Sequence, residues 1–125
     1  MTYDPENIFA KILRGEIPNN TVYENDHVLA FRDITPQAPV HILIIPKGAY
    51  TDMTDFASAG TDEKAAMVDA VQAIVKQEGL ETGGYRLITN TGADGGQEVP
   101  HLHWHILAGE PIGKMRCFSN GQDCS

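Results

Sequence analysis

The sequence predicts an α+β fold with a mainly antiparallel sheet. Two helical segments are separated by runs of short strands, without the strand–helix–strand alternation that produces a parallel sheet. The clearest strand, His101–Leu107, alternates histidine with large apolar side chains at a period of two. A chain of 125 residues is long enough for one hydrophobic core and short of two. We therefore expect a single domain.

The first half of the chain predicts one short helix and three strands. Asp4–Asn7 supplies acceptor side chains and a proline ahead of an apolar stripe, so a helix should start here and end before Gly15. A hairpin is expected from Thr21–Glu24 and Val28–Arg32. The β-branched run Val40–Pro46 predicts a central strand that is buried on both faces.

The second half predicts a long helix between two further strands. A loop with a helical turn at Met53–Phe56 should come first, and the helix should begin at an N-cap on Thr61 or Asp62 and stop at Gly79. Tyr85–Thr89 should form the next strand. The helix carries an apolar stripe that should cover one sheet face, against Leu102, Trp104 and Ile106. This stripe consists of Met67, Val68, Val71, Ile74 and Val75.

Composition and charge exclude several classes of protein. Hydrophobic residues make up 42% of the chain and charged residues 21%, as in ordinary globular proteins. A net charge of −8 argues against a nucleic-acid partner, which clustered Lys and Arg would bind. No apolar run approaches the ~18 residues of a membrane span, and the N-terminus does not resemble a signal peptide. We expect a cytoplasmic protein with no membrane partner, whose Cys117 and Cys124 are reduced thiols rather than a tail disulfide.

Three histidines on one face of a strand are unusual as packing. His101, His103 and His105 should point the same way, each roughly 6.5 to 7 Å from the next. One hypothesis makes the central imidazole a nucleophile whose neighbours position it or hold an anion. A second makes the three nitrogens ligands of one Zn²⁺. The third alternative is a solvated strand face without a role.

Two neighbouring features bear on the same chemistry. Asn90–Gln97 contains three glycines within five residues, directly upstream of the histidine strand. Such a turn can aim several backbone N–H groups at one anion, which favours phosphate binding over a plain surface hairpin. His41 begins the central strand and is either a buried structural histidine or a neighbour of the other three.

At the histidine strand the sequence resembles the histidine triad (HIT) superfamily. His101–Leu107 matches its signature of three histidines alternating with apolar residues. The resemblance covers about residues 6 to 113, and residues 114–125 form a tail. Within it, the matching segments resemble the Hint branch of the superfamily in order and spacing. The further matching segments are Asn7–Phe9, Lys11–Ile12, Ala30–Ile34, Pro36–His41, Ile45–Lys47, Gly83–Arg86 and Asn90–Gln97.

The resemblance implies a HIT-like fold and a nucleotide hydrolase. The fold would be a five-stranded antiparallel sheet with two helices, with the sheet continued across a homodimer. The activity would be cleavage at the α-phosphorus of a purine nucleotide or nucleoside phosphoramidate, without a metal or cofactor. A nucleotide-binding regulatory module and a dinucleoside polyphosphate hydrolase are the alternatives.

The resemblance also implies roles for individual residues. His103 would be the nucleophile that forms a nucleotidyl-imidazole, His101 and His105 would orient it and bind the phosphate, and His41 would sit behind them. Asp33 would accept from the ribose hydroxyls. The base would lie among Ile8, Phe9, Ile12, Phe31 and Ile34, and the phosphate site would be lined by Asn90, Gly96, Gln97 and Val99.

The chain departs from the Hint pattern in two places. Glu98 stands where many Hint proteins carry a serine near the leaving group. We expect Glu98 to contact the substrate, and the resemblance does not predict which leaving group it prefers. A carboxylate there can bind a departing amine but repels anionic substrates. The C-terminus lacks the Trp-Pro-Pro ending of some members, and Lys114 and Arg116 are expected to be solvated.

Overall fold

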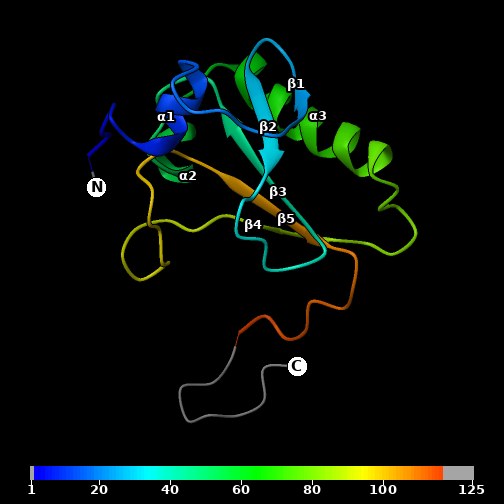
Figure 1. The fold of residues 1–125 in the computed structure, drawn as a ribbon. Helices are drawn as coiled ribbons and strands as arrows, with labels where there is room; N and C mark the ends of the chain where they lie inside the picture. Colours follow the sequence, from blue (N-terminus) through cyan, green and yellow to red (C-terminus); the bar gives the residue numbers. More distant parts are fainter. Residues whose placement is uncertain (1, 117–125) are drawn as a thin grey trace.

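The computed structural model describes residues 2–116, and one five-stranded antiparallel sheet forms its centre (Figure 1). The strands lie in the order β1-β2-β3-β5-β4, so the buried run predicted as a central strand is confirmed in the middle position, as β3. The cysteines Cys117 and Cys124 lie outside the described residues. The strands are β1 (Thr21–Glu24), β2 (Val28–Arg32), β3 (Val40–Pro46), β4 (Arg86–Ile88) and β5 (Trp104–Ala108).

Within the described part of the chain, three helices accompany the sheet, the shortest of which was predicted only as a helical turn. They are α1 (Ile8–Leu13), α2 (Met53–Phe56) and α3 (Thr61–Gln77). Asn7 caps α1, because its side chain accepts from the backbone N–H of Ala10. Figure 1 shows α1 and α3 on either side of the strands.

Each face of the sheet packs on a different helix. Val71 and Ile74 of α3 lie in one core cluster with Leu102, Trp104 and Ile106, which confirms the predicted packing of the long helix. On the other face, Phe9 and Ile12 of α1 pack against β2 and β3. The apolar residues that alternate with the histidines therefore belong to the α3 side, and the histidines to the α1 side.

Several predicted boundaries were wrong. The ladder of β5 begins only at Trp104, so His101 and His103 precede the strand rather than lying in it. The N-cap of α3 is Gly60, because its carbonyl accepts the first helical hydrogen bond, from Lys64. Val68 is 62% exposed instead of buried, since it lies at the edge of the helix face that covers the sheet. The strand expected over Tyr85–Thr89 keeps only its three central residues.

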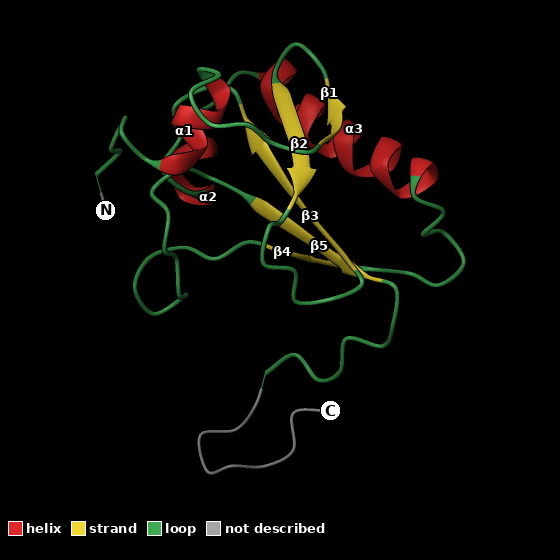
Figure 2. Cartoon of the chain, viewed as in Figure 1, coloured by secondary structure: helices red, strands yellow, loops and turns green. Residues whose placement is uncertain are grey.

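The connection from β4 to β5 brings the histidines to the α1 side of the sheet. Figure 2 shows it as loop throughout, on the side of the molecule where α1 and α2 lie. The N–H of Leu102 donates to the carbonyl of Tyr50 at 2.8 Å, just before α2. None of the helices within residues 2–116 has the length and apolar character required to span a membrane.

Candidate active site

A cavity of about 500 Å³ opens on the α1 side of the sheet. It combines apolar side chains, two carboxylates and two of the three clustered histidines. A cavity of this size and mixed lining suits a small ligand. Its lining residues are Phe9, Asp33, Thr35, Gln37, Leu43, Asn90, Gly96, Glu98, Val99, His103 and His105.

His103 is buried and held by a single strong contact. Its Nδ1 lies 2.7 Å from the backbone carbonyl oxygen of His101. A carbonyl oxygen can only accept, so Nδ1 carries the proton and donates. The lone pair of the neutral ring is consequently on Nε2, and the His103 side chain lines the cavity. The Phe9 ring packs against the His103 ring in an edge-to-face arrangement, with ring centroids 4.8 Å apart.

His105 and His41 form a second oriented pair. The backbone N–H of Gln37 donates to Nδ1 of His41 at 3.0 Å, which places the His41 proton on Nε2. The Nε2–H of His41 in turn donates to Nδ1 of His105 at 2.9 Å, so the His105 proton is on Nε2. Nε2 of His105 is buried without a hydrogen-bond partner among the described residues. A buried donor beside a cavity is suited to an anionic ligand.

His101 lies behind the cavity instead of lining it, and it is completely buried. Its Nε2 donates to the carbonyl oxygen of Pro46 at 2.9 Å, and its Nδ1 accepts from the Tyr3 hydroxyl at 2.9 Å. Both ring nitrogens are therefore used by protein contacts.

Burial keeps all four of these imidazoles neutral near pH 7. Desolvation lowers the pKa of His41, His101 and His103. It lowers the pKa of His105 to about 4, with a further contribution from the neighbouring His103 and His41. Neutral rings retain the lone pairs that nucleophilic attack requires.

The geometry argues against zinc held by the three clustered histidines, because His101 has no free ring nitrogen. Within residues 2–116 the side chains that could share a metal ion are instead Asp33, His41 and His105, with one atom from each within 4.8 Å of the others. The contact from Gln37 keeps the His41 proton on Nε2, the atom that faces this group. A metal ligand must present a lone pair, so this set is poorly prepared for a metal.

The glycine-rich loop is fixed by Gln97. The side-chain oxygen of Gln97 accepts from the N–H of Gly92 at 3.0 Å, and its amide donates to the carbonyls of Thr51 at 2.7 Å and Val99 at 3.0 Å. Gly96 has a φ of +78°, which favours glycine. Asn90, Gly96 and Glu98 line the cavity, whereas the buried side chain of Gln97 holds the loop in place.

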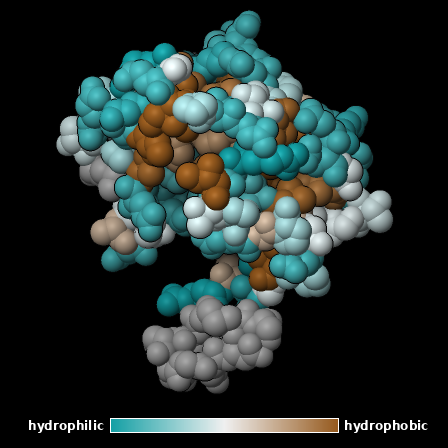
Figure 3. All heavy atoms as spheres, in the orientation of Figure 1, coloured by the Kyte–Doolittle hydropathy of each residue, from teal (hydrophilic) through white to brown (hydrophobic). Residues whose placement is uncertain are grey.

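The predicted base-binding residues divide into three groups. Phe9 lines the cavity. Ile12 and Phe31 are buried in the core cluster beneath it. Ile8 and Ile34 are exposed, by 42% and 92%, and Figure 3 shows apolar surface reaching the outside near α1. In the tail, Lys114 and Arg116 are exposed and do not line the cavity.

Sequence reasoning missed several residues of the site. Leu43 faces the same side as His105, its partner in the β3–β5 register, and alternation along β3 from His41 could have identified it. Thr35 and Gln37 come from the proline-containing loop after Asp33, where no periodic signal exists. Tyr3, which contacts His101 at 2.9 Å, precedes the residues that the resemblance covers, so no motif marked it.

The fold and the site together define a class of protein: a small α+β domain with a histidine-lined cavity on one sheet face. Comparison with known proteins makes this specific. A family model described as the HIT domain matches residues 14–112. The chain therefore belongs to the HIT family, as the resemblance predicted.

Individual relatives agree with this assignment. An uncharacterized HIT-like protein of Azospirillum brasilense is 55% identical, over 91% of this chain and 94% of its own. The purine nucleoside phosphoramidase of Escherichia coli is 49% identical, over 88% of this chain and 92% of its own. Among solved structures, a histidine triad protein from Clostridium difficile is 43% identical with a TM-score of 0.83, over 92% of this chain and 100% of that one.

Proposed function

We propose that this protein hydrolyses purine nucleoside phosphoramidates through a covalent intermediate on His103. The observation that carries the proposal is the 2.7 Å contact that fixes the His103 proton on Nδ1 and leaves the Nε2 lone pair at the cavity. The relative named purine nucleoside phosphoramidase, 49% identical over most of the chain, supports the choice of substrate.

The reaction would proceed in two displacements at phosphorus. Nε2 of His103 attacks the α-phosphorus and forms a bond to it, the bond between phosphorus and the amine breaks, and the amine leaves with a proton taken up from solvent. Water then attacks the nucleotidyl-imidazole, gives up a proton to solvent and breaks the bond to Nε2, which releases the nucleoside monophosphate and restores the neutral His103. The unpartnered N–H of His105 would donate to a phosphate oxygen, and the emerging negative charge would strengthen that bond.

The rest of the cavity would hold the nucleoside. Phe9, Leu43 and Val99 offer apolar surface for a purine. One oxygen of Asp33 already accepts from the N–H of Thr35 at 2.7 Å, which fixes the carboxylate so that it can accept from ribose hydroxyls.

The direct test is hydrolysis of adenosine 5'-phosphoramidate, with and without a chelator. We expect turnover that survives the chelator, together with a protein adduct of nucleoside monophosphate mass after rapid acid quench. Tight binding of AMP with no turnover on any phosphoramidate would instead favour a regulatory binding module and overturn the proposal.

The charge of the cavity favours an amine leaving group over a polyphosphate. Asp33 and Glu98 line it, and no lysine or arginine is found among its described lining residues. We expect Glu98→Gln to change the preference between phosphoramidates of cationic and anionic amines by roughly three- to tenfold, towards the anionic ones, as one exposed charge would. The measurement is kcat/KM for both substrates. Asp94→Asn, an exposed carboxylate of the same loop outside the cavity lining, is the control, and an equal shift in that variant would contradict a specific role of Glu98.

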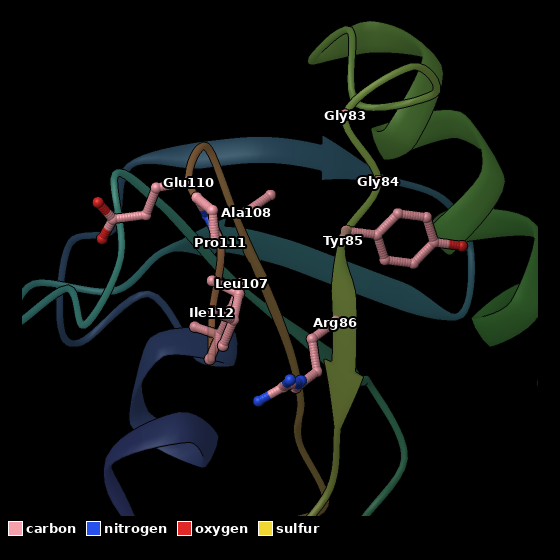
Figure 4. A pocket seen from close by; sticks show the side chains of 9 residues that line it. All are labelled: Gly83, Gly84, Tyr85, Arg86, Leu107, Ala108, Glu110, Pro111 and Ile112. Carbon is pink, nitrogen blue, oxygen red and sulfur yellow. The ribbon is translucent and has the colours of Figure 1, made fainter. Parts of the chain in front are cut away.

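We also propose that a second copy pairs with the β4 edge of the sheet. β4 is one of the two edge strands of the sheet, and a groove between it and α3 is lined mainly by apolar side chains, including Val68, Leu87 and Trp104. Leu87 is 44% exposed, and the buried indole N–H of Trp104 has no partner among residues 2–116. Figure 4 shows Tyr85 directed towards α3, with Arg86 on the opposite side of the strand.

The association is tested by mass in solution. We expect light scattering to report twice the 13.6 kDa of one chain, and Leu87→Asp to shift the mass to the monomer, because a buried unpaired charge is unfavourable at an interface. Met53→Asp, at a residue that is 40% exposed on α2, should leave the mass unchanged. A wild-type monomer at micromolar concentration would refute the pairing.

A further inference from the structure

His101 occupies a position that the sheet does not fix. The ladder of β5 starts at Trp104, three residues later, so His101 has no strand partner. Its backbone N–H donates to Val99 within the same loop, at 2.9 Å. Its completely buried ring is held by two hydrogen bonds, one to the carbonyl of Pro46 and one from Tyr3.

The two contacts together select one tautomer of His101. The Pro46 carbonyl requires a proton on Nε2, which leaves a lone pair on Nδ1. The Tyr3 hydroxyl lies 2.9 Å from that lone pair and donates to it. The Tyr3 ring also packs on the imidazole, with centroids 5.6 Å apart. Without the hydroxyl, a buried acceptor would lose its partner.

The same residue orients His103. The carbonyl oxygen of His101 accepts the proton of His103 Nδ1 at 2.7 Å. A continuous path therefore runs from the Tyr3 hydroxyl through the His101 ring and backbone to the His103 imidazole. Phe9 packs against both rings, with centroids 6.3 Å from His101 and 4.8 Å from His103. A tilt of His101 would move the carbonyl that sets the direction of the His103 lone pair.

We infer that Tyr3, in the segment before α1, is a positioning residue for the reaction at His103. It acts through His101 and does not line the cavity. This inference rests on the proposed function, since it concerns the rate of attack by the same imidazole. It assigns a function to an N-terminal segment that precedes the residues matched by the family model.

The test compares Tyr3→Phe with the wild type. Phenylalanine keeps the ring against His101 and removes only the hydroxyl. We expect kcat for a phosphoramidate to fall roughly three- to tenfold while KM changes less than about twofold. The reason is that the lost hydrogen bond orients the attacking imidazole and does not contact the substrate. Tyr50→Phe, which removes a hydroxyl bonded to Glu63 at 2.7 Å, is the matched control and should retain the wild-type kcat.

A second readout does not depend on turnover. In ¹⁵N spectra of the unliganded protein, we expect the His101 Nδ1 resonance to move in Tyr3→Phe, because the nitrogen loses its donor, and to stay fixed in Tyr50→Phe. An unchanged resonance, or an unchanged kcat despite a lower melting temperature, would overturn the positioning role. A wild-type protein without phosphoramidase activity would overturn the proposed function instead, so the two failures are distinguishable.

Discussion

His103→Ala is expected to lower kcat for adenosine 5'-phosphoramidate by at least about three orders of magnitude. The imidazole is the attacking group, and no other described nitrogen of the cavity presents an oriented lone pair: the His105 Nδ1 lone pair accepts from His41, and its Nε2 carries a proton. Removing a covalent nucleophile has effects of this size or larger. Binding of AMP should weaken far less, since the remaining lining of the cavity stays in place.

The control for this variant is His27→Ala. His27 is half-buried at the turn between β1 and β2 and does not line the cavity, so it should retain the wild-type kcat. Rates are measured in steady state with chelator, and the acid-quenched adduct is sought by mass spectrometry. Turnover of His103→Ala within tenfold of the wild type, or an adduct that persists in it, would show that another group attacks phosphorus.

Gly95→Ala is expected to reduce kcat/KM by roughly ten- to a hundredfold while leaving the fold intact. A Cβ at this position would lie 2.4 Å from the carbonyl oxygen and 2.8 Å from the nitrogen of Thr91, and both are backbone atoms of the same loop. The loop would have to shift, and Gln97 opposes the shift because it bonds to Gly92, Thr51 and Val99. A displacement of about 1 Å in a positioning element can cost this much in rate.

Gly83→Ala provides the comparison for this prediction. A Cβ there meets nothing within 4 Å, and Gly83 does not line the cavity, so kcat/KM should not change. Circular dichroism and thermal unfolding check that both variants are folded. Wild-type kcat/KM in Gly95→Ala would mean that the loop tolerates the change or does not contact the substrate.

The sequence determined most of the fold. The alternation of His101–Leu107 correctly divided histidines from core residues, because side chains alternate even where the backbone has not yet joined the ladder. The bounds of β1, β2 and β3 followed from turn residues and β-branched runs. The N-cap of α3, predicted at Thr61 or Asp62, was wrong, since glycine also serves at an N-cap and Gly60 takes that place.

The composition of the site was only partly visible in the sequence. The motif residues Asp33, Asn90, Glu98, Val99, His103 and His105 do line one cavity. Gln97 belongs to the same motif, yet its side chain forms hydrogen bonds that hold the loop in place, including one to the carbonyl of Thr51. A local pattern marks residues that matter without distinguishing contact with a ligand from support of a neighbour, because the difference depends on side-chain direction.

Tertiary structure alone decided the proton positions that make the site reactive. The tautomer of His103 is set by a backbone carbonyl, that of His41 by the N–H of Gln37, and that of His101 by Pro46 and Tyr3. Pro46 and Tyr3 lie 55 and 98 residues from His101 in the chain. Hydrogen bonds between such distant groups exist only once the chain has folded. The contacts of His103 with His101 and of His41 with Gln37 are local, but they depend on backbone directions that the sequence pattern does not show. The sequence therefore supplied the imidazoles, and the folded backbone determined which nitrogen of each carries the lone pair.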